Sequence, residues 1–375
     1  MTRLVDEKID QLRARARREI DDGLLPSCQF ALAIDGEVVL QETYGAATGA
    51  NRYAIFSATK PIVASAVWLL MQEGGVDVSR PVAHYFPEFA DNGKDAVTVE
   101  QVMLHTAGFP RAPLGPPAWF DREARVKKMA SWRLNWEPGT RFEYHATSAH
   151  WVLGEIVERV GGRDCPTFVC DEILRPLGLL PRLRLGVPVD EQGDILDLAG
   201  CGEAATSGEI MAVYGIPELP ATEVTEDAML RYNEAEVRSL GVPGAGAFSD
   251  ASSVALYYQA LLHNPRRLWS PRLLEDVTSR VRNTLRERLL GYPANRTLGL
   301  IVAGDDGRAN QRGFGRTGSP SIFGHNGAAG QLAWADPETG LSFCYLTNGI
   351  DRHSLRLGRR GVALSSIAAE CAKPA

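Results

Sequence analysis

Segments that read as β-strands occur near the two ends of this chain, while the stretch between them reads mainly as helix. Five runs are rich in apolar, β-branched and aromatic residues: residues 29–34, 38–44, 298–302, 331–335 and 341–347. The first two runs flank Asp35-Gly36, which is a strong signal for a hairpin. The last two flank a turn-forming stretch at residues 336–340. We therefore predict an α+β fold whose antiparallel sheet is shared by the N- and C-terminal parts of the chain.

Helical patterns surround these strands and fill the middle of the chain. The predicted helices cover residues 5–22, 57–73, 99–105, 149–160, 251–262 and 354–371. Residues 181–235 carry acidic residues and several prolines without a regular pattern, and a loop of that length is often a lid or a pocket wall. We predict a discontinuous sheet domain of residues 1–75 and 250–375 and a mainly helical subdomain of residues 76–249. The active site is expected in the groove between them.

The charge pattern and the cysteine spacing exclude several classes of function. The net charge of −6 gives no basic footprint for nucleic acid. The longest apolar run, residues 61–71, is too short to span a bilayer, and the first residues do not form an export signal. The six cysteines form no C-x-x-C pair and no zinc-ligand spacing. We predict a cytoplasmic protein with reduced thiols, without a metal or other cofactor; the oligomeric state stays open.

Ser57 and Lys60 are the first candidate catalytic residues. They are three residues apart at the start of the apolar run, which places them one turn apart on one face of a helix. The hydroxyl would lie at the positive end of that helix, and burial would let the lysine act as a base. This is the arrangement of a nucleophile and its activator.

Two more segments carry residues suited to the same chemistry. Tyr144 lies between the turn Pro138-Gly139 and the helix at 149–160, and a phenol near a lysine can relay a proton. The glycine-rich residues 324–330 precede a strand, where a backbone N–H could complete an oxyanion hole with that of Ser57. Taken singly, Tyr144 is more typical of a structural tyrosine, and the glycine-rich segment is more typical of a turn.

Taken together, these motifs resemble the serine β-lactamase and penicillin-binding-protein superfamily. The matching segments, in order, are residues 56–61, 104–108, 138–144 and 324–327, and the resemblance runs from about residue 24 to residue 365. Within the superfamily, the chain is most similar to class C β-lactamase-like serine hydrolases, including the family VIII carboxylesterases. The resemblance implies an antiparallel sheet flanked by helices, a helical subdomain and a site between them.

The resemblance also implies roles for individual residues. Ser57 would be the acylated nucleophile, Lys60 its general base, and Tyr144 the proton shuttle to the leaving group. The backbone amides of Ser57 and Ala328 would hold the oxyanion. The residues implied to lie beside the substrate are Ala146, His325, Asn326 and Gly327. His105 falls in a segment that reads as a structural turn.

Two departures from the family pattern bear on the substrate. Ala146 stands where the β-lactamases carry an asparagine that holds an acylamino side chain. His325 stands where they carry a lysine, so the cation that would meet a substrate carboxylate is absent or dependent on pH. Both changes favour a neutral ester, and we expect a carboxylesterase with a small-molecule ester substrate and no nucleic-acid or membrane partner. An amidase or D-aminopeptidase, a weak β-lactamase, an acyltransferase and a non-catalytic penicillin-recognising domain are the alternatives.

Other signals carry less weight. Residues 295–297 spell a glycosylation sequon, which means nothing in a cytoplasmic protein. Trp119, Phe120 and Trp136 could line an apolar pocket, although packing in the core explains them equally well.

Overall fold

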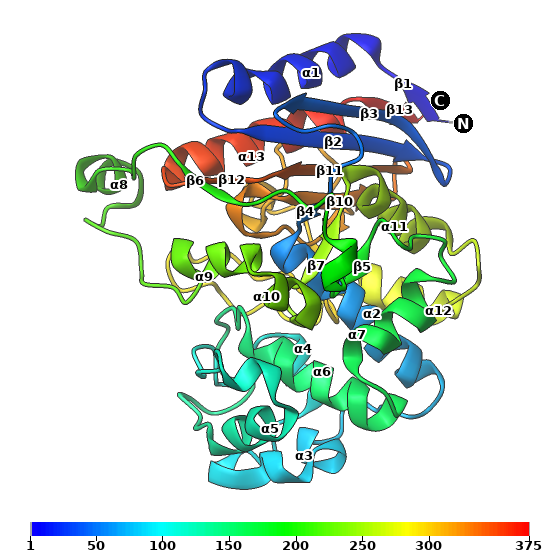
Figure 1. Ribbon diagram of the computed structural model, residues 1–375, viewed down its shortest axis with the longest axis vertical. Coiled ribbons are helices and arrows are strands. Elements are labelled where there is room, and N and C mark those ends of the chain that lie inside the picture. The colour runs from blue at the N-terminus through cyan, green and yellow to red at the C-terminus, as the bar shows by residue number, and fades with distance from the viewer. Residues whose placement is uncertain (1, 375) are drawn as a thin grey trace.

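A computed structural model describes residues 2–374 and shows a six-stranded antiparallel sheet built from both ends of the chain (Figure 1). In sheet order the strands are β3 (Glu37–Gly45), β2 (Ser27–Ile34), β11 (Leu341–Thr347), β10 (Leu332–Asp336), β9 (Phe323–Gly324) and β8 (Ile301–Val302). The predicted sharing of one sheet by the two ends is therefore confirmed, because β2 pairs with β11 along its length.

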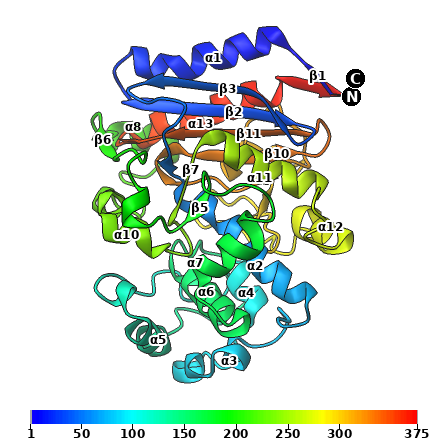
Figure 2. The same ribbon diagram turned by 45° about the vertical axis from the view of Figure 1, so that its right-hand side comes forward.

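The two faces of this sheet carry side chains of different size. On β2, Phe30 and Leu32 point into a core formed with α1 (Asp6–Asp21) and α13 (Ser354–Ala369), whereas Ala31 and Ala33 face α11 (Ala251–His263). Both faces are therefore buried, and the small alanines allow α11 to approach the strands closely. Figures 1 and 2 show α1 and α13 on one side of the sheet and α11 on the other.

Most remaining helices come from the middle of the chain. They are α2 (Lys60–Gln72), α3 (Val82–Tyr85), α4 (Val99–Met103), α5 (Arg122–Ser131), α6 (Ser148–Gly161), α7 (Cys165–Phe168), α8 (Ser207–Tyr214), α9 (Glu226–Leu230), α10 (Ala235–Leu240) and α12 (Pro271–Ser279). Among them, α3 and α5 lie at the far end of the molecule from α1 (Figure 1). Short strands complete the fold: β1 (Thr2–Leu4) with β13 (Ala372–Pro374), β12 (Gly349–Asp351) with β6 (Ala199–Cys201), and β4 (Tyr53–Ala54) with β7 (Ala247–Ser249) and β5 (Arg184–Leu185). The proposed division into two subdomains stays a prediction.

The structure corrects two details of the predicted elements. The strand expected at residues 298–302 is only β8, because Gly299 turns the chain with a φ of 113° and the Leu298 carbonyl accepts a hydrogen bond from the Trp68 indole. The helix expected from Ser57 begins as a 3₁₀ turn, Phe56–Thr59, and becomes α-helical at Lys60.

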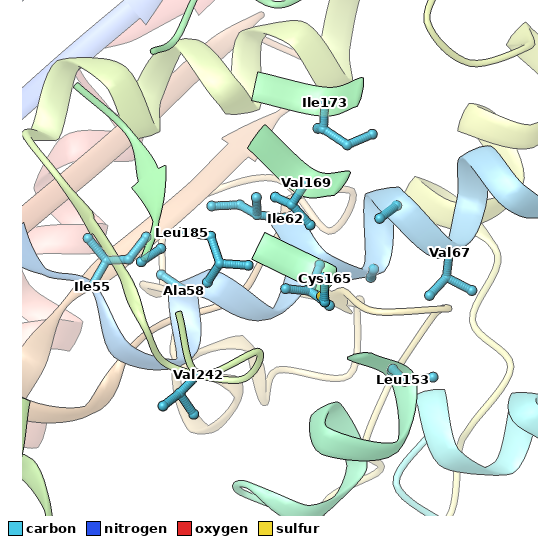
Figure 3. Close-up of a cluster of buried hydrophobic side chains, with 14 of the residues drawn as sticks. Ile55, Ala58, Ile62, Val67, Leu153, Cys165, Val169, Ile173, Leu185 and Val242 are labelled. Carbon is cyan, nitrogen blue, oxygen red and sulfur yellow. The ribbon is translucent and has the colours of Figure 1, made fainter. Parts of the chain in front are cut away.

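Helix α2 lies in the centre of the molecule and is buried on all sides from Lys60 to Leu70. Figure 3 shows apolar side chains gathered around its first turns, including Ile62 of α2, Cys165 of α7 and Val169 just after it. A helix buried on every side cannot shift without opening the core. Its first turn is thus a rigid platform for Lys60 and for the 3₁₀ turn with Ser57 that leads into it.

Within residues 2–374, no helix is both long enough and apolar enough to cross a membrane. All six cysteines have free thiols, and five of them are buried, while Cys201 is partly exposed.

Candidate active site

The turn that presents Ser57 is held by the short strand before it. The Ile55 N–H donates to the Ala247 carbonyl of β7, and the Ala247 N–H donates to the Thr59 hydroxyl. Between these anchors, Phe56 has a φ of 45°, a conformation that is uncommon for a residue with a side chain. Such backbone strain persists only where the surrounding structure enforces it, and it often accompanies function.

Lys60 lies directly beside Ser57, with its side chain completely buried. Its Nζ is 3.1 Å from Ser57 Oγ, 2.7 Å from the Ala146 carbonyl oxygen and 2.9 Å from the Gly244 carbonyl oxygen. Burial lowers the pKa of the Lys60 ammonium, and this effect outweighs the neighbouring Tyr144 and Glu223, which raise it. A neutral amine has two N–H bonds for the two carbonyls, which leaves its lone pair toward Ser57 Oγ.

Tyr144 lies on the loop before α6, with its ring 5.2 Å from Lys60 Nζ. The loop is fixed by His105, whose Nδ1 accepts a hydrogen bond of 3.2 Å from the His145 N–H and whose ring lies 4.8 Å from that of Tyr144. Burial holds the pKa of His105 well below its ordinary value. His105 is thus a neutral side chain that positions the Tyr144 loop.

The glycine-rich segment forms a tight turn between β9 and β10. The Gly327 N–H donates to the Gln331 carbonyl, and Ala328 begins a 3₁₀ turn. Within residues 2–374, neither the Ala328 N–H nor the Ser57 N–H donates a hydrogen bond to the protein. Both residues line the same pocket, so their N–H groups remain available to a ligand oxygen.

Gly327 allows this turn to pack closely against the Ser57 loop. A side chain at this position would not fit, because its Cβ would lie 2.2 Å from the Ile55 carbonyl oxygen. We expect Gly327→Ala to push the two loops apart. If the Ala328 N–H holds the oxyanion, as the resemblance implies, kcat/KM should fall about 100-fold, the cost of displacing one oxyanion donor. The matched control is Gly358→Ala on the exposed part of α13, where a Cβ meets nothing within 4 Å. That control should retain full activity and unfold at a higher temperature, since alanine favours a helix over glycine. Equal activity of Gly327→Ala and the parent would contradict the steric argument.

The pocket that contains Ser57 has a volume of about 910 Å³. One wall comes from the segment that the sequence left unassigned, since Pro220–Val224 line it. Here Glu223 accepts hydrogen bonds from the Thr147 N–H and hydroxyl at 3.1 and 3.0 Å, and burial raises the pKa of this carboxyl. Ala146 lines the pocket too, and the bonds from Thr147 to Glu223 hold part of residues 181–235 against the Tyr144 loop.

His325 and Asn326 also line the pocket, but the structure revises their side-chain chemistry. Burial holds the pKa of His325 well below 6.5, with Arg296 and Lys60 adding to the effect, so His325 is neutral at neutral pH. The Asn326 amide is taken up by neighbouring backbone: its Nδ2 donates to the Gly313 carbonyl, and its Oδ1 accepts from the Ala333 N–H of β10. Of the two alternatives left open for His325, an absent cation or a pH-dependent one, the lowered pKa favours the absent cation near neutral pH.

Sequence reasoning missed Arg296, a buried cation that lines this pocket. Its guanidinium is 5.0 Å from the ring centre of Tyr144, and its Nη1 is 3.4 Å from His325 Nε2. The only local signal was the sequon at residues 295–297, which concerns Asn295 instead. By contrast, Trp119, Phe120 and Trp136 do not line the pocket, and Trp119 is buried in the core with its indole bound to the Leu114 carbonyl.

Known proteins resemble this chain over most of its length, in sequence and in fold. A family model described as Beta-lactamase matches residues 5–365. The esterase/beta-lactamase LipL of Mycobacterium tuberculosis is 27% identical over 320 residues, which cover 78% of this chain and 68% of LipL. A penicillin-binding protein homologue from Caulobacter crescentus has a TM-score of 0.77 and 28% identity, over 98% of this chain and 99% of that one. A family VIII carboxylesterase has a TM-score of 0.77 and 24% identity, over 98% of this chain and all (100%) of the other.

Proposed function

The chain belongs to the Beta-lactamase family and is a serine hydrolase, and from this premise we propose that it cleaves carboxylic esters through an acyl-enzyme on Ser57. The proposal rests on one observation, the positions of the three oxygen atoms around Lys60 Nζ. Two backbone carbonyls accept its N–H bonds, and Ser57 Oγ lies at 3.1 Å on the remaining side. A neutral lysine in that position is a general base aimed at one hydroxyl.

The proposed reaction has two halves. Lys60 takes the Ser57 proton while Oγ attacks the ester carbonyl carbon, and the N–H groups of Ser57 and Ala328 donate to the oxyanion. Tyr144, together with Lys60, passes the proton to the leaving alkoxide as the ester bond breaks. Water then attacks the acyl-enzyme with the same groups in reverse roles, which releases the acid and restores Ser57.

The choice of esters rests on Ala146. Its methyl group stands where the β-lactamases of this superfamily present an asparagine amide to the acylamino side chain of the substrate. Without that amide, a substrate amide in this part of the pocket would lose hydrogen bonds and bind less well than an apolar acyl chain. The alternatives that use the same acyl-enzyme are an amidase or D-aminopeptidase, a weak β-lactamase, and an acyltransferase with an alcohol in place of water. A non-catalytic penicillin-recognising domain is less well supported because Ser57, Lys60 and Tyr144 are all present.

A panel of substrates tests the proposal. We expect kcat/KM on 4-nitrophenyl butyrate to reach on the order of 10⁴ M⁻¹ s⁻¹ and to exceed the values for D-alanine 4-nitroanilide and nitrocefin. Addition of an alcohol acceptor, with product analysis by chromatography, separates hydrolysis from acyl transfer. Turnover of the anilide or of nitrocefin without turnover of the ester would overturn the proposal. Stoichiometric acylation by all three without turnover would indicate the non-catalytic domain.

A further inference from the structure

Arg296 is a buried cation in the active-site pocket without an anionic partner. Only 8% of the residue is exposed, and it lines the same pocket as Ser57 and Tyr144. Its Nε is buried and has no hydrogen-bond partner, and no carboxylate forms an ion pair with the guanidinium within residues 2–374. Burying a charge without a partner is costly, so such a group is seldom kept for packing alone.

His325, whose ring contacts Arg296, does not neutralise the guanidinium. His325 Nδ1 lies 2.9 Å from the Asn326 carbonyl oxygen, which can only accept a hydrogen bond, so Nδ1 carries the proton. His325 Nε2 is then an acceptor, and it faces Arg296 Nη1 at 3.4 Å. The imidazole orients the guanidinium and leaves its full positive charge in the pocket.

Two aromatic rings hold the guanidinium in place. Its central carbon lies 5.4 Å from the ring centre of Phe142 and 5.0 Å from that of Tyr144. The Tyr144 hydroxyl has no hydrogen-bond partner within the described residues, so Arg296 contacts the ring face and does not bind the phenol oxygen. The rings offset part of the cost of burying the cation, and no anion does so.

The other arginines that line the pocket differ from Arg296 because each has a carboxylate partner. Arg111 and Arg288 pair with Glu143 at 2.8 and 3.4 Å, and Arg312 pairs with Asp306. Arg111 and Arg288 share one carboxylate but have mostly exposed side chains that water can solvate, and Arg312 has a carboxylate of its own. Arg296 is therefore the arginine of this pocket whose charge is left for a ligand.

We propose that Arg296 binds a carboxylate in the leaving-group part of the substrate, an inference that rests on the proposed ester hydrolysis. A guanidinium recognises a carboxylate through paired N–H donors. The leaving-group side is indicated because Arg296 lies over the ring of Tyr144, the residue proposed to protonate the leaving alkoxide. The substrates would then be esters of hydroxy acids. This reverses the expectation of a neutral ester, which depended on the absence of a cation.

The test compares 3-acetoxybenzoate with its neutral analogue 3-acetoxybenzamide, in the parent and in Arg296→Met. We expect the parent to prefer the carboxylate about 10- to 100-fold in kcat/KM, the range of a hydrogen bond to a charged group. In Arg296→Met that preference should fall to about one- to threefold. Arg296→Lys keeps the positive charge but lacks the paired N–H donors of a guanidinium, so its preference for the carboxylate should be intermediate. Arg288→Met is the matched control, since it removes one exposed positive charge at the rim of the pocket and should leave the ratio within about threefold of the parent.

Each remaining outcome has a definite meaning. An unchanged preference in Arg296→Met overturns the inference, and so does a parent without any preference. If kcat/KM for both substrates falls by the same factor in Arg296→Met, Arg296 acts only through Tyr144, and the inference is again wrong. If the parent hydrolyses neither ester, the proposed function fails, and calorimetry with 3-acetamidobenzoate and 3-acetamidobenzamide decides the binding question. If the parent binds the carboxylate more tightly than the amide and Arg296→Met loses this difference, the anion site is supported even without ester hydrolysis. Equal binding of both compounds by the parent would overturn the inference.

Discussion

Replacement of Ser57 by alanine is expected to lower kcat/KM on 4-nitrophenyl butyrate by about four to six orders of magnitude, as for other serine nucleophiles. The variant keeps the pocket but has no oxygen to form the acyl-enzyme. Intact-protein mass spectrometry after a fluorophosphonate probe reads out the same event directly. The parent should gain the mass of one adduct, and Ser57→Ala should gain none.

Ser65→Ala provides the matched control for this experiment. Ser65 lies on α2, the helix that follows the Ser57 turn, but its hydroxyl bonds to the Pro61 carbonyl and to Tyr257 inside the core. We expect this variant to form the adduct, with some loss of thermal stability from the unpaired Tyr257 hydroxyl. An adduct on Ser57→Ala would place the nucleophile elsewhere. A parent without an adduct would show that Ser57 is not activated toward this probe.

Replacement of Lys60 by methionine is the second change with a large expected effect, a loss of about three orders of magnitude or more in kcat/KM. Methionine fills a similar volume but has no lone pair for the Ser57 proton. The carbonyls of Ala146 and Gly244 also lose their shared donor, so some thermal stability should be lost as well. Circular dichroism at the assay temperature separates the two effects, because a folded but inactive variant isolates the chemical role. A variant that is folded and retains activity would rule out Lys60 as the base.

The pH dependence of the parent gives an independent view of Lys60. Because burial lowers the pKa of Lys60, the neutral amine forms at a pH below the ordinary value of 10.5. Activity should therefore rise with pH through a midpoint below 10.5 and then level off, after correction for spontaneous hydrolysis. The same shift means that the folded state binds fewer protons than the unfolded state in this window, so its stability should also rise with pH there. A midpoint at or above 10.5 would contradict the assignment.

The sequence predicted the sheet well because its strands carry their own local signals. The hairpin of β2 and β3 is marked by Asp35-Gly36, and β11 was predicted with the bounds that the structure shows. Short elements were harder to predict because tertiary contacts shape them. The turn at Phe56–Thr59 depends on hydrogen bonds to β7, which lies far away in the sequence.

The roles of the candidate site residues stay predictions, but their positions illustrate which part of a site the sequence contains. Ser57 and Lys60 could be paired because a helix fixes residues three apart. Arg296 and Glu223 could not be found in this way, since each comes from an irregular segment and meets the site only through the folded chain. The chemistry of these two residues also depends on how deeply they are buried and on which partners surround them. Neither property can be predicted from the neighbouring sequence, because the surrounding residues come from distant parts of the chain.

The pairing of β2 with β11 has a consequence for the order in which this protein can fold during synthesis. The Thr347 hydroxyl donates to the Ser27 carbonyl across a separation of 320 residues, so β2 waits for its neighbour on the order of half a minute at common translation rates. During that time the edge of the β2–β3 hairpin is open to pairing with other chains. The turn with Ala328 is made only shortly before β11, so a nascent chain carries Ser57 for most of its synthesis without the turn that lies against it. A ribosome-bound chain should therefore resist the fluorophosphonate probe until its last strands have emerged and paired.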